Sequence, residues 1–179
     1  AHGRRATLVG IMNPIIIALD VDSAAEARRL VDRLGGSVSF YKVGMELYAA
    51  AGMEFVRELT AAGKQVFLDM KYYDIGETVK RATARVAAAG ARFLTVHAVP
   101  HVMRAAVEGK GGPGLKILAV TVLTSLDDAD LAEMGYKYGV RELVARRVRQ
   151  AMEAGVDGLV CSPLEVAEVR RLAGPEAIL

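Results

Sequence analysis

Short apolar runs alternate with longer amphipathic stretches along most of this chain. The runs that predict strands are Ile15–Leu19, Val38–Val43, Val66 to about Lys71, Arg92–His97, Leu115–Leu123 and Val156–Val160. The stretches that predict helices are 23–34, 46–62, 77–89, 101–108, a long region reaching Ala154 with a break near 135–139, and 164–172. The strands are apolar on both faces, and strands of this kind that alternate with helices indicate a parallel sheet.

The number of strand–helix units points to a particular α/β architecture. Six units are followed by Ala177-Ile178-Leu179, which resembles the start of a seventh strand, whereas a closed (β/α)8 TIM barrel needs eight. We therefore expect a TIM barrel truncated after about six βα units, with residues 14–179 as its catalytic domain and the C-terminal part missing. Residues 1–13 are interpreted as a tag remnant or a flexible N-terminus. A doubly wound sheet is the alternative, although no glycine-rich dinucleotide motif follows the first strand.

Composition narrows the class of protein further. The 179 residues are 53% hydrophobic and 25% charged, with a net charge of +2 and a single cysteine, Cys161. Because the charges are interspersed, nothing favours a nucleic-acid or membrane surface, and no apolar stretch reaches the about 18 residues that span a bilayer. One cysteine excludes an intrachain disulfide framework and favours a reducing compartment, so we expect a cytoplasmic protein.

The segment Asp69–Thr78 concentrates charged residues immediately after an apolar strand. In a regular strand Asp69 and Lys71 would share one face, about 6.6 Å apart along the backbone, and Asp74 would follow in the loop. Burying an unpaired charge costs several kcal/mol. Such a cluster is therefore either a satisfied ion-pair network or a catalytic site, and both interpretations remain open from these residues alone.

Most of the other predicted strands also end in a polar group, at the barrel end where active sites form. The strand-end residues in chain order are Asp20, Lys42, Asp69 with Lys71, His97, Thr124 with Ser125, and Cys161 with Ser162. Each taken singly could be a helix cap or a satisfied core residue. Together they place two lysines among three carboxylates, an array in which each charge stabilises its neighbours. We expect Lys71 to stay charged and to act as an acid rather than as a Schiff-base nucleophile.

From about Pro14 to Leu179 the chain resembles the orotidine 5′-phosphate decarboxylase family. The resemblance rests on Ala18-Leu19-Asp20, Lys42-Val43-Gly44, Asp69-x-Lys71-x-x-Asp74-Ile75-x-x-Thr78, Val96-His97-Ala98, Thr121–Ser125 and Leu159–Pro163, in that order. It implies a carboxy-lyase of de novo pyrimidine biosynthesis that converts orotidine 5′-monophosphate to UMP without a cofactor or a metal. It also implies a homodimer whose active sites are shared across the interface.

The resemblance also implies a role for each matching residue. Lys71 would protonate C6 of the pyrimidine as carbon dioxide leaves, and Asp69 would lie against the departing carboxylate. The expected catalytic residues are Lys71, Asp69, Asp74 and Lys42. The expected substrate-binding residues are Asp20, Lys42, Asp69, Ile75, Thr78, His97, Thr124 and Ser125. Of these, Asp20 and Lys42 would hold the charge network and the ribose hydroxyls. Thr124 and Ser125 would contact the base. The residues expected to reach into the partner's site are Asp74, Ile75 and Thr78.

Two departures from the family pattern leave alternatives open. Gly76-Glu77 stands where the family carries Pro-Asn, and this is closer to its Mg²⁺-dependent sister enzymes, the hexulose-phosphate synthases and 3-keto-gulonate-phosphate decarboxylases. Those enzymes bind Mg²⁺ through a glutamate near the end of the second strand, where Lys42 would repel a cation. The family's phosphate-binding loop and Gly-Arg pair would lie beyond Leu179. A non-catalytic half-barrel that serves as a binding module is a third possibility.

Overall fold

The computed structural model describes residues 15–179, so the interpretation of residues 1–13 lies outside the described residues. Six strands form one sheet, and each pairs in parallel with the next along the chain. The strands are β1 (Ile17–Ala18), β2 (Phe40–Gly44), β3 (Gln65–Tyr72), β4 (Phe93–His97), β5 (Lys116–Val120) and β6 (Gly158–Val160). A doubly wound sheet reverses its strand order. The strictly sequential order is instead that of a barrel, as predicted.

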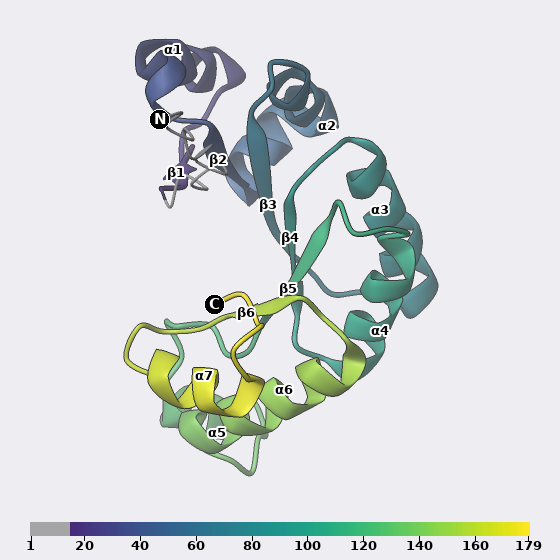
Figure 1. Ribbon diagram of the computed structural model, residues 1–179. Coiled ribbons are helices and arrows are strands. Elements are labelled where there is room, and N and C mark those ends of the chain that lie inside the picture. The colour runs from purple at the N-terminus through teal and green to yellow at the C-terminus, as the bar shows by residue number, and fades with distance from the viewer. Residues whose placement is uncertain (1–14) are drawn as a thin grey trace, which may run out of the picture.

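The helices lie on the outer side of the curved sheet, and the sheet does not close on itself within residues 15–179 (Figure 1). They are α1 (Ala24–Leu34), α2 (Met45–Ala61), α3 (Gly76–Ala88), α4 (Pro100–Gly109), α5 (Asp128–Glu133), α6 (Val140–Ala154) and α7 (Val166–Ala173), with a 3-10 turn at Gly35–Ser37. Ile178 forms a parallel bridge with Gly158 of β6, where the sequence predicted a seventh strand to start. The architecture is therefore an open TIM-barrel-type arrangement.

The element boundaries differ from the predicted ones in a few places. β1 and β5 are shorter than the apolar runs that predicted them, because sheet pairing rather than hydrophobicity sets where a strand ends. Gly52, at φ 64°, interrupts α2, which the sequence predicted as one continuous helix. The predicted break in the long helical region is confirmed as the loop between α5 and α6. Ser23 is the N-cap of α1, since its hydroxyl accepts the Glu26 backbone N–H.

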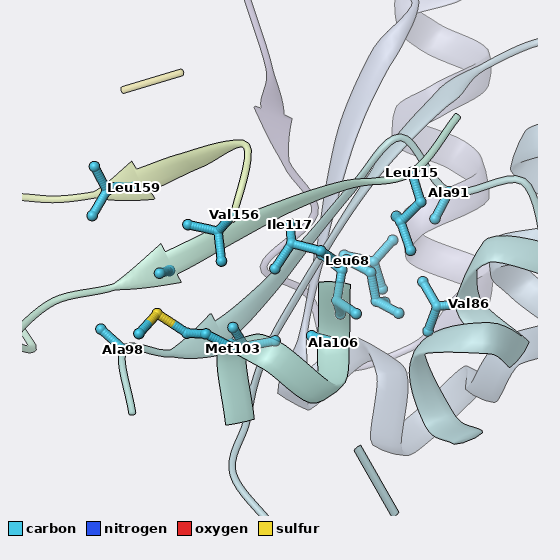
Figure 2. Close-up of a cluster of buried hydrophobic side chains, with 14 of the residues drawn as sticks. Leu68, Val86, Ala91, Ala98, Met103, Ala106, Leu115, Ile117, Val156 and Leu159 are labelled. Atoms are coloured by element: carbon cyan, nitrogen blue, oxygen red, sulfur yellow. The ribbon is translucent and has the colours of Figure 1, made fainter. Parts of the chain in front are cut away.

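The two faces of the sheet carry different side chains because side chains alternate along each strand. The outer face packs against the helices and forms the main core; Figure 2 shows Leu68 and Ile117 lying between the strands and α4, close to Met103 and Ala106. A smaller apolar layer on the inner face consists of Phe40, Phe67, Phe93, Leu118, Val160 and Ile178. This inner layer supports the site described below.

The contact between α3 and α4 depends on a glycine. A Cβ atom added at Gly109 would lie 2.3 Å from the backbone oxygen of Lys80, which is too close for any side chain. We predict that Gly109→Ala lowers the free energy of unfolding by about 1 to 3 kcal/mol, the usual cost of overpacking. Chemical denaturation monitored by circular dichroism measures the loss. Gly36→Ala is the control, because nothing lies within 4 Å of its Cβ position; equal stabilities for the two variants would contradict the prediction.

Candidate active site

The backbone of β3 is irregular where its charged residues lie. Leu68 pairs with Leu94 and Tyr72 pairs with Val96, so Asp69, Met70 and Lys71 occupy the space opposite the single residue Thr95. Lys71 has a φ of 51° and is the one non-glycine residue with positive φ among residues 15–179. β3 therefore runs through Asp69 and Lys71, as the sequence predicts, but its pairing with β4 is interrupted there by a bulge. A bulge re-aims side chains, and bulges are common beside active sites.

Four predicted site residues form one chain of ion pairs at the carboxyl ends of β1, β2 and β3. Lys71 Nζ lies 2.9 Å from Asp69 Oδ1, and Lys42 Nζ lies 3.9 Å from Asp69 Oδ2. Lys42 Nζ also donates a hydrogen bond to Asp20 Oδ1 at 3.1 Å. The Asp69 side chain is only 17% exposed, whereas that of Asp20 is 66% exposed. The charges therefore alternate from a mostly buried carboxylate outward to solvent. Of the three carboxylates expected in this array, Asp20 and Asp69 belong to it, whereas Asp74 accepts the Ile75 backbone N–H instead.

Thr95 of β4 is a member of this cluster that the sequence analysis missed. Its hydroxyl donates a hydrogen bond to Asp69 Oδ1 at 2.8 Å and accepts one from the Lys71 backbone N–H at 2.9 Å. Thr95 is fully buried. The available signal was its position two residues before His97 in an otherwise apolar strand, which places both side chains on the inner face.

The charged cluster lies beside an aromatic layer. Phe40, Phe67 and Phe93 each precede a site residue by two positions, namely Lys42, Asp69 and Thr95, and so share its face of the sheet. The Phe93 ring centroid lies 5.3 Å from that of Phe40 and 5.7 Å from that of Phe67. Because this apolar layer excludes water from one side, interactions among the charges are stronger than they would be on an open surface.

His97 lies at the edge of the cluster. Burial lowers the pKa of its imidazole below the ordinary value, and the positive charges of Arg147 and Lys71 lower it further. The Tyr73 ring meets His97 edge-on, at 5.8 Å between centroids. A neutral imidazole has one donor and one acceptor nitrogen, so His97 can take part in polar contacts to a substrate without adding charge.

Three predicted site residues lie in the exposed segment that follows β3 and are not members of the ion-pair chain. Asp74, Ile75 and Thr78 follow β3 and begin α3, and all three are exposed. Asp74 Oδ1 accepts the backbone N–H of Ile75 at 2.6 Å, and the Ile75 side chain is 74% exposed. These residues therefore form an exposed segment with Tyr73, and within residues 15–179 no ion pair joins Asp74 to Lys71 or Lys42.

Thr124 and Ser125 lie on the turn that follows β5. The backbone N–H of Leu126 donates to the Leu123 oxygen at 3.0 Å, which closes the turn and leaves Thr124 and Ser125 exposed. Arg147 of α6 fixes the start of this segment, because its guanidinium donates to the backbone oxygen of Thr121 and to the Tyr136 hydroxyl. The turn is thus held at its start by Arg147 and carries two exposed hydroxyl residues.

Within residues 15–179 no group of three or more His, Cys, Asp or Glu residues could hold a metal ion. In the same range no helix is long and apolar enough to cross a membrane.

Comparison with known proteins identifies the family. Residues 13–179 match the profile of the Orotidine 5'-phosphate decarboxylase / HUMPS family. The chain belongs to this family. Two curated relatives named orotidine 5'-phosphate decarboxylase support the assignment. The protein from Caulobacter sp. (strain K31) is 58% identical over 92% of this chain and 72% of its own length. The protein from Rhodopseudomonas palustris (strain HaA2) is 56% identical over 92% of this chain and 70% of its own length.

A solved structure agrees with the family assignment. The crystal structure of orotidine 5'-phosphate decarboxylase from Lactobacillus acidophilus superposes with a TM-score of 0.86 at 36% identity, covering 92% of this chain and 78% of that one. The barrel-type fold expected from the sequence is therefore the fold of the family.

Proposed function

We propose that this protein is a carboxy-lyase that decarboxylates orotidine 5′-monophosphate to UMP in pyrimidine biosynthesis. The observation that carries the proposal is the Lys71 ammonium, held 2.9 Å from Asp69 at the carboxyl end of β3. It stands in a chain that is 58% identical to a decarboxylase of that name. Active sites of this fold lie at the same end of the strands.

In the proposed reaction Lys71 supplies both charge and a proton. The bond between C6 and the carboxylate breaks, its electron pair stays on C6, and carbon dioxide leaves. An ammonium fixed beside C6 stabilises the developing negative charge more than it stabilises the substrate. Lys71 then transfers its proton to C6, and its neutral amine recovers a proton from solvent.

The acids of the cluster orient this ammonium. Asp69 accepts hydrogen bonds from Lys71 and Thr95 through the same oxygen, so its position fixes the direction of the lysine side chain. We assign Asp69 to the side of C6 on which the carboxylate departs. Lys42 and Asp20, paired at 3.1 Å, complete the charge array and are placed to meet the ribose hydroxyls.

We further propose a cytoplasmic homodimer with shared active sites. Asp74, Ile75 and Thr78 are exposed and take no part in the ion-pair chain of Lys71, so they are available to a second subunit. A two-fold interface would deliver each segment to the partner's cluster reciprocally. Thr124, Ser125 and His97 are assigned to the substrate, with the exposed hydroxyl of Ser125 contacting the edge of the base.

The Mg²⁺-dependent sister activity is not favoured. Lys42 lies within β2 and its Nζ is 3.9 Å from Asp69 Oδ2, so a divalent cation at this position would face a fixed positive charge. A non-catalytic binding module is also disfavoured, because it would have no use for a lysine held in a positive-φ conformation.

A direct assay tests the proposed function. We predict that the purified full-length protein converts orotidine 5′-monophosphate to equal amounts of UMP and carbon dioxide. Because Lys71 is the only acid that the proposed reaction uses, the rate should be the same within about two-fold with EDTA and with added Mg²⁺. The absorbance change measures the rate under each condition, and chromatography measures the products. Activity that appears only with Mg²⁺ would favour the sister enzymes, and no turnover under either condition would favour a binding module.

A further inference from the structure

We infer that Thr95 is a positioning residue, whose hydroxyl sets the direction of the proton donor Lys71 and the orientation of Asp69. The inference rests on the proposed function and deepens it. It starts from the irregular pairing of β3 with β4, where Asp69, Met70 and Lys71 face the single residue Thr95.

A bulge of this kind removes backbone groups from the ladder of the sheet. A buried backbone N–H without a partner costs free energy comparable to a lost hydrogen bond. Here a side chain provides the acceptor: the Lys71 N–H donates to Thr95 Oγ1 at 2.9 Å. The Thr95 hydroxyl therefore replaces a ladder hydrogen bond at the residue whose backbone has the unusual φ of 51°.

The same hydroxyl has its proton directed to Asp69. Because Thr95 Oγ1 already accepts the Lys71 N–H, its own proton is free to donate to Asp69 Oδ1, at 2.8 Å. Lys71 Nζ donates to that same Oδ1 at 2.9 Å. The three groups close a ring that runs from the Lys71 backbone through Thr95 and Asp69 back to the Lys71 side chain. One buried hydroxyl on the neighbouring strand therefore holds the backbone of Lys71 directly and its side chain through Asp69.

Burial and packing make Thr95 suited to this role. Thr95 is completely buried and has no surface accessible to solvent. The neighbouring residues on the same face of β4 are Phe93 and His97. β-Branching restricts its χ1 rotation, so the hydroxyl keeps one direction. Thr95 does not touch the reacting atoms; it acts through Lys71 and Asp69.

Replacing Thr95 by valine tests the inference, because valine keeps the shape and β-branching but removes the hydroxyl. We expect Thr95→Val to lower kcat by about 10- to 100-fold, as expected when a reacting group is displaced by a fraction of an ångström to 1 Å. KM for orotidine 5′-monophosphate should stay within about two-fold, and Thr95→Ser should restore most of kcat. A purely structural role would instead lower the melting temperature and leave the kcat of the folded enzyme unchanged.

The chain offers a matched control. Thr83 of α3 is also fully buried, and its hydroxyl has no hydrogen-bond partner in the described part of the chain. Thr83→Val should therefore leave kcat unchanged and stability equal or higher. If Thr95→Val does not fold, Thr95→Ser and Thr95→Ala give the same comparison, since only the serine keeps a hydroxyl; equal kcat in these two would overturn the inference.

The outcomes separate this inference from the proposed function. Faster hydrogen exchange at the Lys71 amide in Thr95→Val than in the wild type supports the role of the Lys71 N–H to Thr95 hydrogen bond without requiring turnover. An inactive wild type with this change in exchange would overturn the proposed function and keep the structural part of the inference. An active wild type with an equally active Thr95→Val variant would keep the function and overturn the role of Thr95.

Discussion

Replacing Lys71 by alanine is expected to lower kcat roughly 10⁴-fold or more while leaving the fold intact. Proton transfer by a placed side chain contributes about 10²- to 10⁴-fold, and a fixed charge at the developing anion contributes about 10²- to 10³-fold. Lys71→Ala removes both contributions at once. Asp69 keeps its contacts with Thr95 and Lys42, so the carboxylate is not left without partners. Steady-state assay of UMP formation measures the loss.

A second lysine of the same strand region provides the control. Lys64 lies immediately before β3, at the opposite end from Lys71, and its Nζ donates to the backbone oxygens of Gly35 and Val38. Lys64→Ala should keep kcat close to that of the wild type. Circular dichroism and UMP binding should show that Lys71→Ala is folded and binds the nucleotide. Retention of more than about a tenth of the wild-type kcat in Lys71→Ala would refute the assignment of this residue as the proton donor.

Mixing two inactive variants should restore activity if the active sites are shared. Lys71→Ala and Asp74→Ala are each expected to be nearly inactive as homodimers, because every site then lacks one of the two groups. In a mixed dimer one site receives Lys71 from one subunit and Asp74 from the other. After complete exchange of subunits, half of the dimers are mixed and about one quarter of all sites are intact. Activity of the mixture should therefore approach about one quarter of the wild-type value.

The control for this experiment uses two residues of the same cluster. Asp69 and Lys71 lie 2.9 Å apart within one chain, so a mixture of Asp69→Ala and Lys71→Ala contains no intact site in any dimer. That mixture should stay inactive. If the mixture with Asp74→Ala is also no more active than its components, Asp74 does not serve the partner's site. Activity that does not depend on protein concentration, down to the monomer, would argue the same way.

The sequence predicted the topology and the ion-pair chain because both depend on local patterns. Alternating apolar runs determine the strand order, and polar residues directly after those runs necessarily reach the same end of a parallel sheet. Asp20, Lys42, Asp69 and Lys71 were found in this way. Asp20 follows β1, whereas Lys42, Asp69 and Lys71 lie within β2 and β3, after the apolar residues that begin those strands. The local pattern was therefore enough to place them.

The bulge and Thr95 could not be predicted in the same way, because they arise from pairing between two strands. Whether Asp69–Lys71 forms a regular strand depends on the register with β4, which the sequence of β3 does not contain. The exposure of Asp74 also depends on how the chain leaves β3, which the local sequence pattern does not give. The capping box of α5, in which Asp127 and Asp130 each accept a backbone N–H of the other, was also missed; an acid at both positions is not the usual Ser/Thr with Glu/Gln pattern.

Lys71 combines a backbone conformation that lowers the stability of the fold with the side chain that the proposed reaction needs. A residue with a side chain held at a φ of 51° costs about 1 to 3 kcal/mol, whereas glycine adopts this φ with little penalty. Exchanging the lysine for glycine would relieve this backbone strain, and would remove the proposed proton donor in the same step. The strain at this position is thus tied to the proposed chemistry rather than to the fold.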